Sequence, residues 1–288
     1  MKKILLLGSS GFIGSNLKEF LVNKNYDIDI PTHEELDVLY EENVYFYLKK
    51  NKYDIIINAL DGGSIDNNYF ENRFRMFQNL AVHNDLYERM IYFGSGAEYG
   101  RELPIRKIKE NQINRINPID TYGFCLQQMN NCARNSRNIY NFRLFGIFGK
   151  YECWQRRFIS NAICKVICGY PITIRQNRVM DYLYIDDLCK IVEWAINDKP
   201  IYHDYNVVSG KEYSLYNLAK IVKKVMKSEV PIFIAKAGEL DAYTANNERI
   251  LKELQNYKFE DIEISIEKLS EWYKNNRQII IKENLLYQ

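Results

Sequence analysis

Residues 4–14 read Ile-Leu-Leu-Leu-Gly-Ser-Ser-Gly-Phe-Ile-Gly, an apolar run followed by closely spaced glycines. The continuous apolar run at 4–7 is typical of a parallel strand buried on both faces. Beyond it, Ile13, Leu17 and Leu21 fall on one stripe of a helix. The stretch therefore predicts a strand, a glycine turn and a helix in direct succession.

The glycine turn has the spacing GxxGxxG through Gly8, Gly11 and Gly14. Glycines at these places allow a tight turn and a close approach of the backbone to a pyrophosphate, toward which the first amides of the helix point. Such glycines also occur in plain strand-to-helix loops, but a strand and a helix on either side favour a dinucleotide site. The expected contacts are Gly8, Ser10, Gly11, Phe12, Ile13 and Gly14.

The same alternation of strand and helix continues along the chain. Apolar runs at 26–30, 54–59 and 90–94 predict strands, with helices at 42–50 and 70–86 between them. Further strands are expected at 139–145 and 202–208. The pattern predicts an α/β fold, a Rossmann-type doubly wound parallel sheet with its ligands at the carboxyl ends of the strands.

The length of 288 residues suits one large domain with a smaller appendage. We expect residues 1–150 to form the dinucleotide-binding domain, and strands near 172–208 to return to its sheet. Residues 151–288 are expected to form mainly a smaller C-terminal substrate-binding lobe, in which Ser214 and Ser265 begin two helices.

Composition excludes several classes of function. Lys and Arg number 39 against 37 Asp and Glu, so no basic excess points to nucleic acid. The first apolar run is too short for a signal segment or a membrane span, which predicts a cytoplasmic protein without a membrane partner. Six cysteines lack a CxxC pair, so neither a metal site nor a disulfide is expected.

The choice between NAD and NADP depends on the end of the second strand. A carboxylate there often binds the ribose 2'-hydroxyl of NAD. Here the strand runs into Ile30-Pro31-Thr32-His33, which favours NADP(H) over NAD(H), because His33 can face a 2'-phosphate. A solvent-exposed loop histidine is the alternative. Further cofactor contacts are predicted at Thr32, His33, Asp37, Ala59 and Leu60, with Asp37 nearer to adenine than to ribose.

Later motifs follow the glycine loop in a fixed order. They are Phe93-Gly94-Ser95-Gly96-Ala97-Glu98-Tyr99-Gly100, Thr121-Tyr122-Gly123, Arg143-Leu144-Phe145 with Gly149, Asp181-Tyr182-Leu183-Tyr184-Ile185-Asp186-Asp187-Leu188, and Asn206-Val207-Val208-Ser209-Gly210. With these motifs, the whole chain resembles the extended short-chain dehydrogenases/reductases that act on nucleotide sugars. The segment 32–38 is most similar to the keto-sugar reductases of that family.

The resemblance implies roles for particular residues. Tyr122 falls on the acid/base position, where it also contacts the cofactor, and Ser95 falls on the hydroxyl that binds the reacting sugar oxygen. The resemblance implies a nucleotide-diphosphate sugar as substrate, bound by Ser95, Gly96, Ala97, Arg157 and Arg178. It also implies a homodimer formed through the helix of Tyr122, with Phe124, Met129 and Cys132 as candidate contacts.

The chain departs from the family at the position four residues after the tyrosine. A free tyrosine ionises near pH of about 10, so the family places a lysine on the same helical face, where it stabilises the phenolate and holds the nicotinamide ribose. Leu126 stands there instead and can do neither. Gln127 and Gln128 lie on other faces of the helix.

Other departures from the family pattern bear on which reaction the protein catalyses and on how it binds its substrate. Ala97 and Arg157 stand where members that also epimerise C3 and C5 have a cysteine and a histidine, which argues against C3/C5 epimerisation and makes simple ketone reduction the better interpretation. Met180 rather than arginine precedes Asp181, and Asp61 follows the third strand with its role open. Asp186 and Asp187 are interpreted as caps of the next helix rather than a metal pair.

Three hypotheses follow. The first is an NADP(H)-dependent reductase of a nucleotide-linked 4-keto sugar in surface polysaccharide or deoxysugar biosynthesis. The second is a nucleotide-sugar 4-epimerase with tightly held NAD. The third, which Leu126 favours, is a catalytically degenerate protein that binds a nucleotide or sugar nucleotide.

Overall fold

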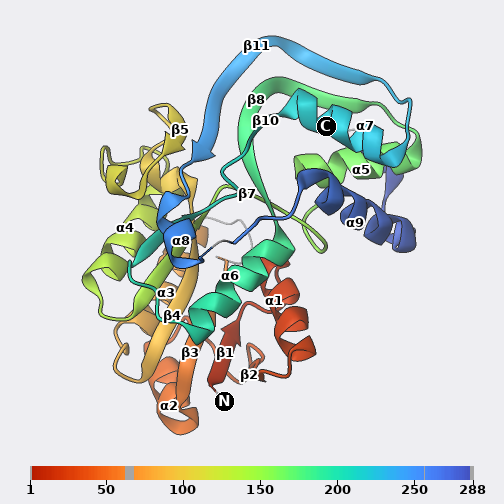
Figure 1. Ribbon diagram of the computed structural model, residues 1–288. Helices are drawn as coiled ribbons and strands as arrows, with labels where there is room; N and C mark the ends of the chain where they lie inside the picture. Colours follow the sequence, from red (N-terminus) through yellow and green to blue (C-terminus); the bar gives the residue numbers. More distant parts are fainter. Residues whose placement is uncertain (1, 62–67, 256, 286–288) are drawn as a thin grey trace.

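A computed structural model describes residues 2–61, 68–255 and 257–285. Its main sheet has the strand order β2-β1-β3-β4-β6-β9, and every neighbouring pair is parallel (Figure 1). This confirms the doubly wound parallel sheet. The strands are β1 (Lys3–Leu7), β2 (Asp27–Asp29), β3 (Tyr53–Asn58), β4 (Tyr87–Ser95), β6 (Ile139–Leu144) and β9 (Asp204–Val207).

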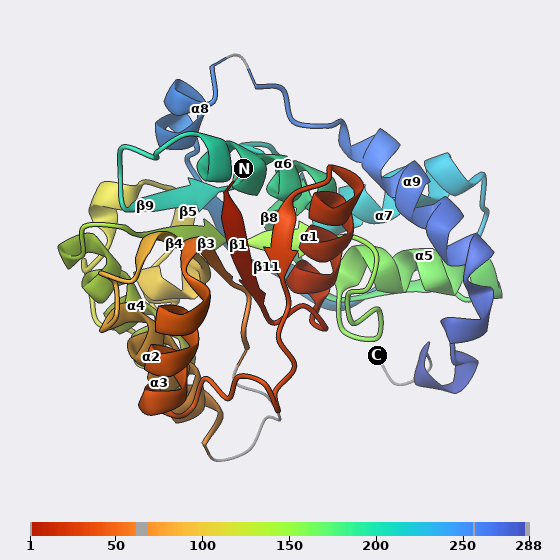
Figure 2. The same ribbon diagram turned by 90° about the horizontal axis from the view of Figure 1, so that it is seen from below.

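Helices cover both faces of this sheet (Figure 2). On one face lie α1 (Phe12–Asn23) and α6 (Ile185–Asn197). On the other lie α2 (Glu41–Asn51), α3 (Tyr69–Ala81) and α4 (Thr121–Asn135). Successive strand residues point to opposite faces, so Ile4 joins the core under α1 and Leu5 the core under α2. Burial on both faces is the reason that β1 is apolar from Ile4 to Leu7.

A second sheet has the order β10-β8-β11-β5, and β7 pairs with β8. Its members are β5 (Ile105–Ile108), β7 (Gly146–Phe148), β8 (Ile172–Tyr184), β10 (Glu212–Ser214) and β11 (Ile232–Ala245). The long strands β8 and β11 arch over α5 and α7 (Figure 1). The remaining described helices are α5 (Phe158–Cys168), α7 (Leu215–Met226), α8 (Glu248–Glu253) and α9 (Ile262–Asn275), with short 3-10 turns at Gly96–Tyr99, Glu110–Gln112, Arg277–Ile279 and Lys282–Leu285.

Two sequence expectations about strands and helices change. Of the region 172–208, only β9 joins the six-stranded sheet, because β8 pairs with β7, β10 and β11 instead. Ser214 does cap α7 by accepting a hydrogen bond from the amide of Asn217. Ser265 does not begin a helix, because the carboxylate of Asp261 already caps α9 one turn earlier.

The interpretation of Asp186 and Asp187 as helix caps is also wrong. Helix α6 begins at Ile185, after Tyr184, which places both carboxylates inside its first turn. Asp187 is buried and accepts hydrogen bonds from the Tyr257 hydroxyl and from the amide of Glu260. It therefore anchors the segment that leads into α9.

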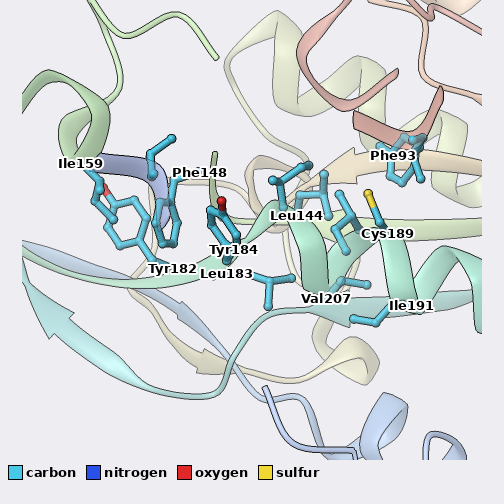
Figure 3. Packing of buried hydrophobic residues seen from close by; sticks show 14 of the residues in the cluster. Phe93, Leu144, Phe148, Ile159, Tyr182, Leu183, Tyr184, Cys189, Ile191 and Val207 are labelled. Atoms are coloured by element: carbon cyan, nitrogen blue, oxygen red, sulfur yellow. The ribbon is translucent and has the colours of Figure 1, made fainter. Parts of the chain in front are cut away.

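One apolar core joins the two sheets (Figure 3). Phe93 and Leu144 come from the main sheet, and Ile191 comes from α6. Phe148 on β7 and Leu183 on β8 continue the same cluster into the second sheet. Because the two sheets share this core, the carboxyl ends of the main-sheet strands are held against the second sheet. None of the described helices is long and apolar enough to cross a membrane.

A fully buried arginine ties the ends of three strands together. Arg143 on β6 donates from Nε to Glu98 at 2.8 Å and from Nη2 to Asp204 at 3.2 Å. Its Nη1 reaches the Tyr99 hydroxyl at 3.0 Å and Asn206 Oδ1 at 3.2 Å. Each nitrogen of the guanidinium thus has an acceptor, as a buried charge requires.

Replacing Arg143 with methionine should lower the free energy of unfolding by about 3–5 kcal/mol, because the carboxylates of Glu98 and Asp204 lose their buried counter-charge. Urea denaturation measures the difference. The matched control is Arg75→Met, which removes an exposed ion pair with Glu71 and should change stability little. Equal losses in the two variants would contradict this account of the network.

Candidate active site

The glycine turn is closed by direct contact between backbones. Gly8 has a φ of +78°, in the left-handed region that favours glycine. A methyl group on Gly8 would overlap the carbonyl of Ala59, and one on Gly14 would overlap the carbonyl of Gly8. The loop after β1 therefore lies against the loop after β3, at the point where the strand order reverses.

The first turn of α1 is open to an anion. Gly11 occupies the N-cap position, no side chain caps the helix, and its first turn carries no acidic residue. The free amides and the helix dipole at this end favour a phosphate group. These residues fit the pyrophosphate of a dinucleotide.

A pocket lies directly beyond this turn, at the carboxyl ends of β1, β3, β4 and β6. It brings together eight of the predicted site residues from five separate parts of the chain. Its lining consists of Gly11, Phe12, Ile13, Ala59, Leu60, Asp61, Arg73, Phe93, Gly94, Ser95, Tyr122, Leu144, Phe145, Ile147 and Arg157. Sequence reasoning had not singled out Arg73, which reaches the pocket from α3.

Ser95 ends β4 and is held by its own turn. Its amide donates to Glu98 Oε1 at 3.0 Å, and its Oγ accepts from the Ala97 amide at 3.3 Å. The buried Arg143 network fixes Glu98, so it also fixes the place of this hydroxyl. Ser95 Oγ lies 3.4 Å from the hydroxyl of Tyr243, a residue of β11 that sequence reasoning also missed.

Tyr122 lies in the first turn of α4. The Asp120 side chain caps this helix by accepting a hydrogen bond from the Gly123 amide at 2.8 Å. The Tyr122 ring is half-buried and lies 6.0 Å from that of Phe70. Leu126, four residues on, has no exposed surface and belongs to the core beneath α2, α3 and α4. Gln127 donates to backbone carbonyls instead, so α4 places no cation beside the tyrosine.

The end of the second strand differs from the sequence expectation, and this affects the argument for cofactor preference. It ends at Asp29 rather than Ile30, so a carboxylate does stand at its tip. This carboxylate accepts hydrogen bonds from the hydroxyls of Tyr47 and Tyr53. His33 has a side chain that is 80% exposed, with Nε2 3.7 Å from Asp37.

The other predicted positions lie outside the pocket lining, namely Gly8, Ser10, Gly14, Thr32, His33, Asp37, Gly96, Ala97 and Arg178. Thr32 and Ser10 are exposed, and Gly96 and Ala97 are buried behind Ser95. Arg178 donates from Nε to the Asp241 carbonyl at 2.7 Å and stacks over Tyr243. In its position on β8 it supports β11 instead of lining the pocket.

The structure also revises which residues of α4 could form the predicted contact with a second subunit. Phe124 is 45% exposed, as a contact residue would be, and Cys132 is partly buried. Met129 is only 3% exposed, because it packs in the core beneath the helix. Met129 is therefore wrong as a member of an intermolecular face.

Comparison with known proteins agrees with this geometry. The model of the NAD dependent epimerase/dehydratase family matches residues 4–208. The chain is 22% identical over 252 residues to GDP-L-colitose synthase of Yersinia pseudotuberculosis, covering 78% of this chain and 82% of that one.

Two solved structures share the fold. A GDP-L-fucose synthetase from Naegleria fowleri bound to NADP superposes with a TM-score of 0.81 at 14% identity, covering 96% of this chain and 95% of that chain. A dTDP-glucose 4,6-dehydratase from Bacillus anthracis in complex with NAD gives 0.80 at 14% identity, over 96% and 98%. The chain belongs to the NAD-dependent epimerase/dehydratase family, which confirms the resemblance and supports a nicotinamide cofactor.

The glycine turn provides a direct test. Gly14→Ala should destabilise the fold and abolish the rise in melting temperature on adding NADPH, because the new methyl group displaces the Gly8 carbonyl. Gly11→Ala is the matched control, since its methyl group would lie 3.4 Å from the same oxygen and the fold should tolerate it. Thermal unfolding with and without NADPH measures both. A Gly14→Ala protein that keeps the wild-type shift would contradict the close-contact account.

Proposed function

We propose that the protein is an NADP(H)-dependent reductase of a nucleotide-linked 4-keto sugar, acting in surface polysaccharide or deoxysugar biosynthesis. The observation that carries the proposal is the single pocket that contains the glycine turn, Ser95 and Tyr122. The names of the relatives support a nucleotide-sugar substrate, since they include a GDP-L-colitose synthase and a GDP-L-fucose synthetase. A cytoplasmic homodimer is part of the proposal.

In this proposal the Ser95 hydroxyl orients the ketone oxygen and Tyr122 gives it a proton. The nicotinamide supplies a hydride to the carbonyl carbon. Ala97 is buried and carries no acid or base, and an arginine, Arg157, stands at the other position, so both groups that the family uses for C3/C5 epimerisation are replaced. Arg157 is exposed at the pocket wall, where its guanidinium suits a diphosphate.

The preference for NADP(H) follows from the groups around the end of β2. Asp29 is already engaged by two tyrosine hydroxyls, which leaves it poorly placed to accept from a ribose 2'-hydroxyl. The exposed His33 can donate to a 2'-phosphate. Cofactor contacts at Thr32, Asp37 and Ser10 remain part of the proposal.

The test is incubation with a panel of nucleotide-linked 4-keto sugars and NADPH or NADH, while the nicotinamide absorbance is followed. We expect oxidation of NADPH with at least one sugar and slower oxidation of NADH. Cofactor binding without any oxidation would favour the degenerate binding protein. NAD that co-purifies and resists dialysis would favour the 4-epimerase.

Tyr122→Phe should lower kcat/KM by about 10²–10⁴, because the ketone oxygen loses its proton donor. Binding of NADPH should persist, since the glycine turn is unchanged. The control is Tyr40→Phe, which alters a tyrosine that is 63% exposed and outside the pocket lining. A Tyr122→Phe enzyme with wild-type turnover would remove the tyrosine from the mechanism.

A further inference from the structure

A largely buried arginine, Arg73, lies beside the tyrosine whose helical lysine is missing. Arg73 comes from the first turns of α3, and its guanidinium carbon lies 5.7 Å from the centre of the Tyr122 ring. Only 12% of its side chain is exposed. Both residues line the pocket that also contains Ser95. A cation thus reaches the tyrosine from a different helix.

Both terminal nitrogens of the guanidinium have partners. It donates from Nη1 to Asp61 and lies 3.5 Å from the Tyr69 hydroxyl, while Nη2 donates to the Phe93 carbonyl at 3.3 Å. Within the described part of the chain, its Nε is buried and has no hydrogen-bond partner. Buried donors are normally satisfied, so the unpartnered Nε makes Arg73 an unusual arginine in this fold.

Charges around Arg73 keep it protonated. Burial lowers the pKa of its guanidinium, but Tyr122, Asp61 and Tyr69 act in the opposite direction, and the pKa is raised overall. Cys125 also faces it, and burial raises the pKa of that thiol although Arg73 opposes the change. The cation therefore persists across the range in which enzymes work.

Position 126 is closed to a charge in this fold. Leu126 is fully buried among apolar side chains of α3 and α4. A lysine there would place its ammonium group in the core without a counter-charge, which is costly. The missing lysine and the arginine on α3 therefore belong to one rearranged site.

We propose that Arg73 is the positioning residue that replaces the absent lysine, and that its guanidinium stabilises the negative charge on Tyr122 after proton transfer. This inference rests on the proposed reductase function. The carbonyl carbon would gain a C–H bond from the hydride that bound NADPH supplies, which leaves NADP⁺, while the carbonyl π electron pair moves to oxygen and that oxygen takes the proton from Tyr122. The phenolate that remains faces Arg73 until it takes up a proton from water.

The first test is the pH dependence of turnover in Arg73→Gln. Turnover in the reductive direction falls as pH rises and the tyrosine loses its proton. A nearby cation favours the ionised form of a phenol, so removal of the Arg73 charge should move this fall to higher pH. Turnover itself should drop at least about tenfold, because the product phenolate is less stable.

Two controls separate charge from structure. Arg73→Lys keeps a cation, so its pH profile should return at least halfway from that of Arg73→Gln to that of the wild type. Arg75→Gln changes an exposed arginine on the same helix and should leave the profile unchanged. Other charged or titratable groups at the pocket, namely Asp61, Tyr69, Cys125, Arg157 and Tyr243, are the same in all variants. An unmoved profile in Arg73→Gln, or a lysine variant no better than glutamine, would overturn the inference.

A second test needs no turnover. The ultraviolet absorbance of the Tyr122 phenolate is obtained by subtracting the titration of Tyr122→Phe from that of the wild type, with NADPH bound. The same subtraction in the Arg73→Gln background should place ionisation at a higher pH, and an identical midpoint would overturn the inference. Failure to reduce any keto sugar would instead refute the proposed function, so the two failures are distinguishable.

Leu126→Lys tests whether Arg73 has taken over the role of the missing lysine or whether the site has lost activity with that lysine. The account expects lower stability and lower turnover, because a second cation enters the core near Arg73. Leu126→Met is the matched control and should retain activity, since it conserves volume and polarity. If the lysine variant turns over well above the wild type, the site is a damaged one that lysine repairs, and the inference is wrong.

Discussion

The buried guanidinium of Arg143 is the constraint on which the pocket depends. Arg143 joins the ends of β4, β6 and β9 through Glu98 and Asp204. With an acceptor for each of its nitrogens, it costs no unsatisfied donor. Through Glu98 it holds the amide of Ser95, so a charge pair in the interior fixes a hydroxyl at the pocket. Arg73 is held less completely, with one nitrogen unpartnered among the described residues.

Most of the fold could be predicted from the sequence, because burial on both faces forces continuous apolar strands. The run at 4–7 and the glycine turn predicted β1, the turn and α1 in their observed order. The second sheet could not be predicted in this way. β8 and β11 are long, partly exposed strands whose pairing joins segments far apart in the chain, and nothing local in 172–184 distinguishes them from strands of the main sheet. The start of α9 was misplaced because Asp261 and Ser265 are both good capping residues.

The candidate site likewise contains residues that local sequence predicts and one that only the three-dimensional packing reveals. Glycine spacing and the tyrosine and serine motifs placed Gly11, Ser95 and Tyr122, all of which line one pocket. Arg73 gave no comparable signal, since an arginine on an amphipathic helix is ordinarily a solvated residue, as Arg75 is two positions on. Its role depends on the packing of α3 against α4, a contact between elements more than forty residues apart. The loss of a lysine within one helix is visible in sequence, whereas its replacement from another helix is visible only in three dimensions.

The central claim is that the charge beside Tyr122 comes from α3 and not from α4. A crystal structure of the protein with NADPH and a bound sugar nucleotide tests this most directly. The account predicts that the guanidinium of Arg73 lies within about 4–6 Å of the Tyr122 oxygen, a separation at which opposite charges interact strongly, with Leu126 still buried in the core. A complex in which Arg73 has turned away from the pocket, or in which Arg157 takes its place against the tyrosine, would contradict the account.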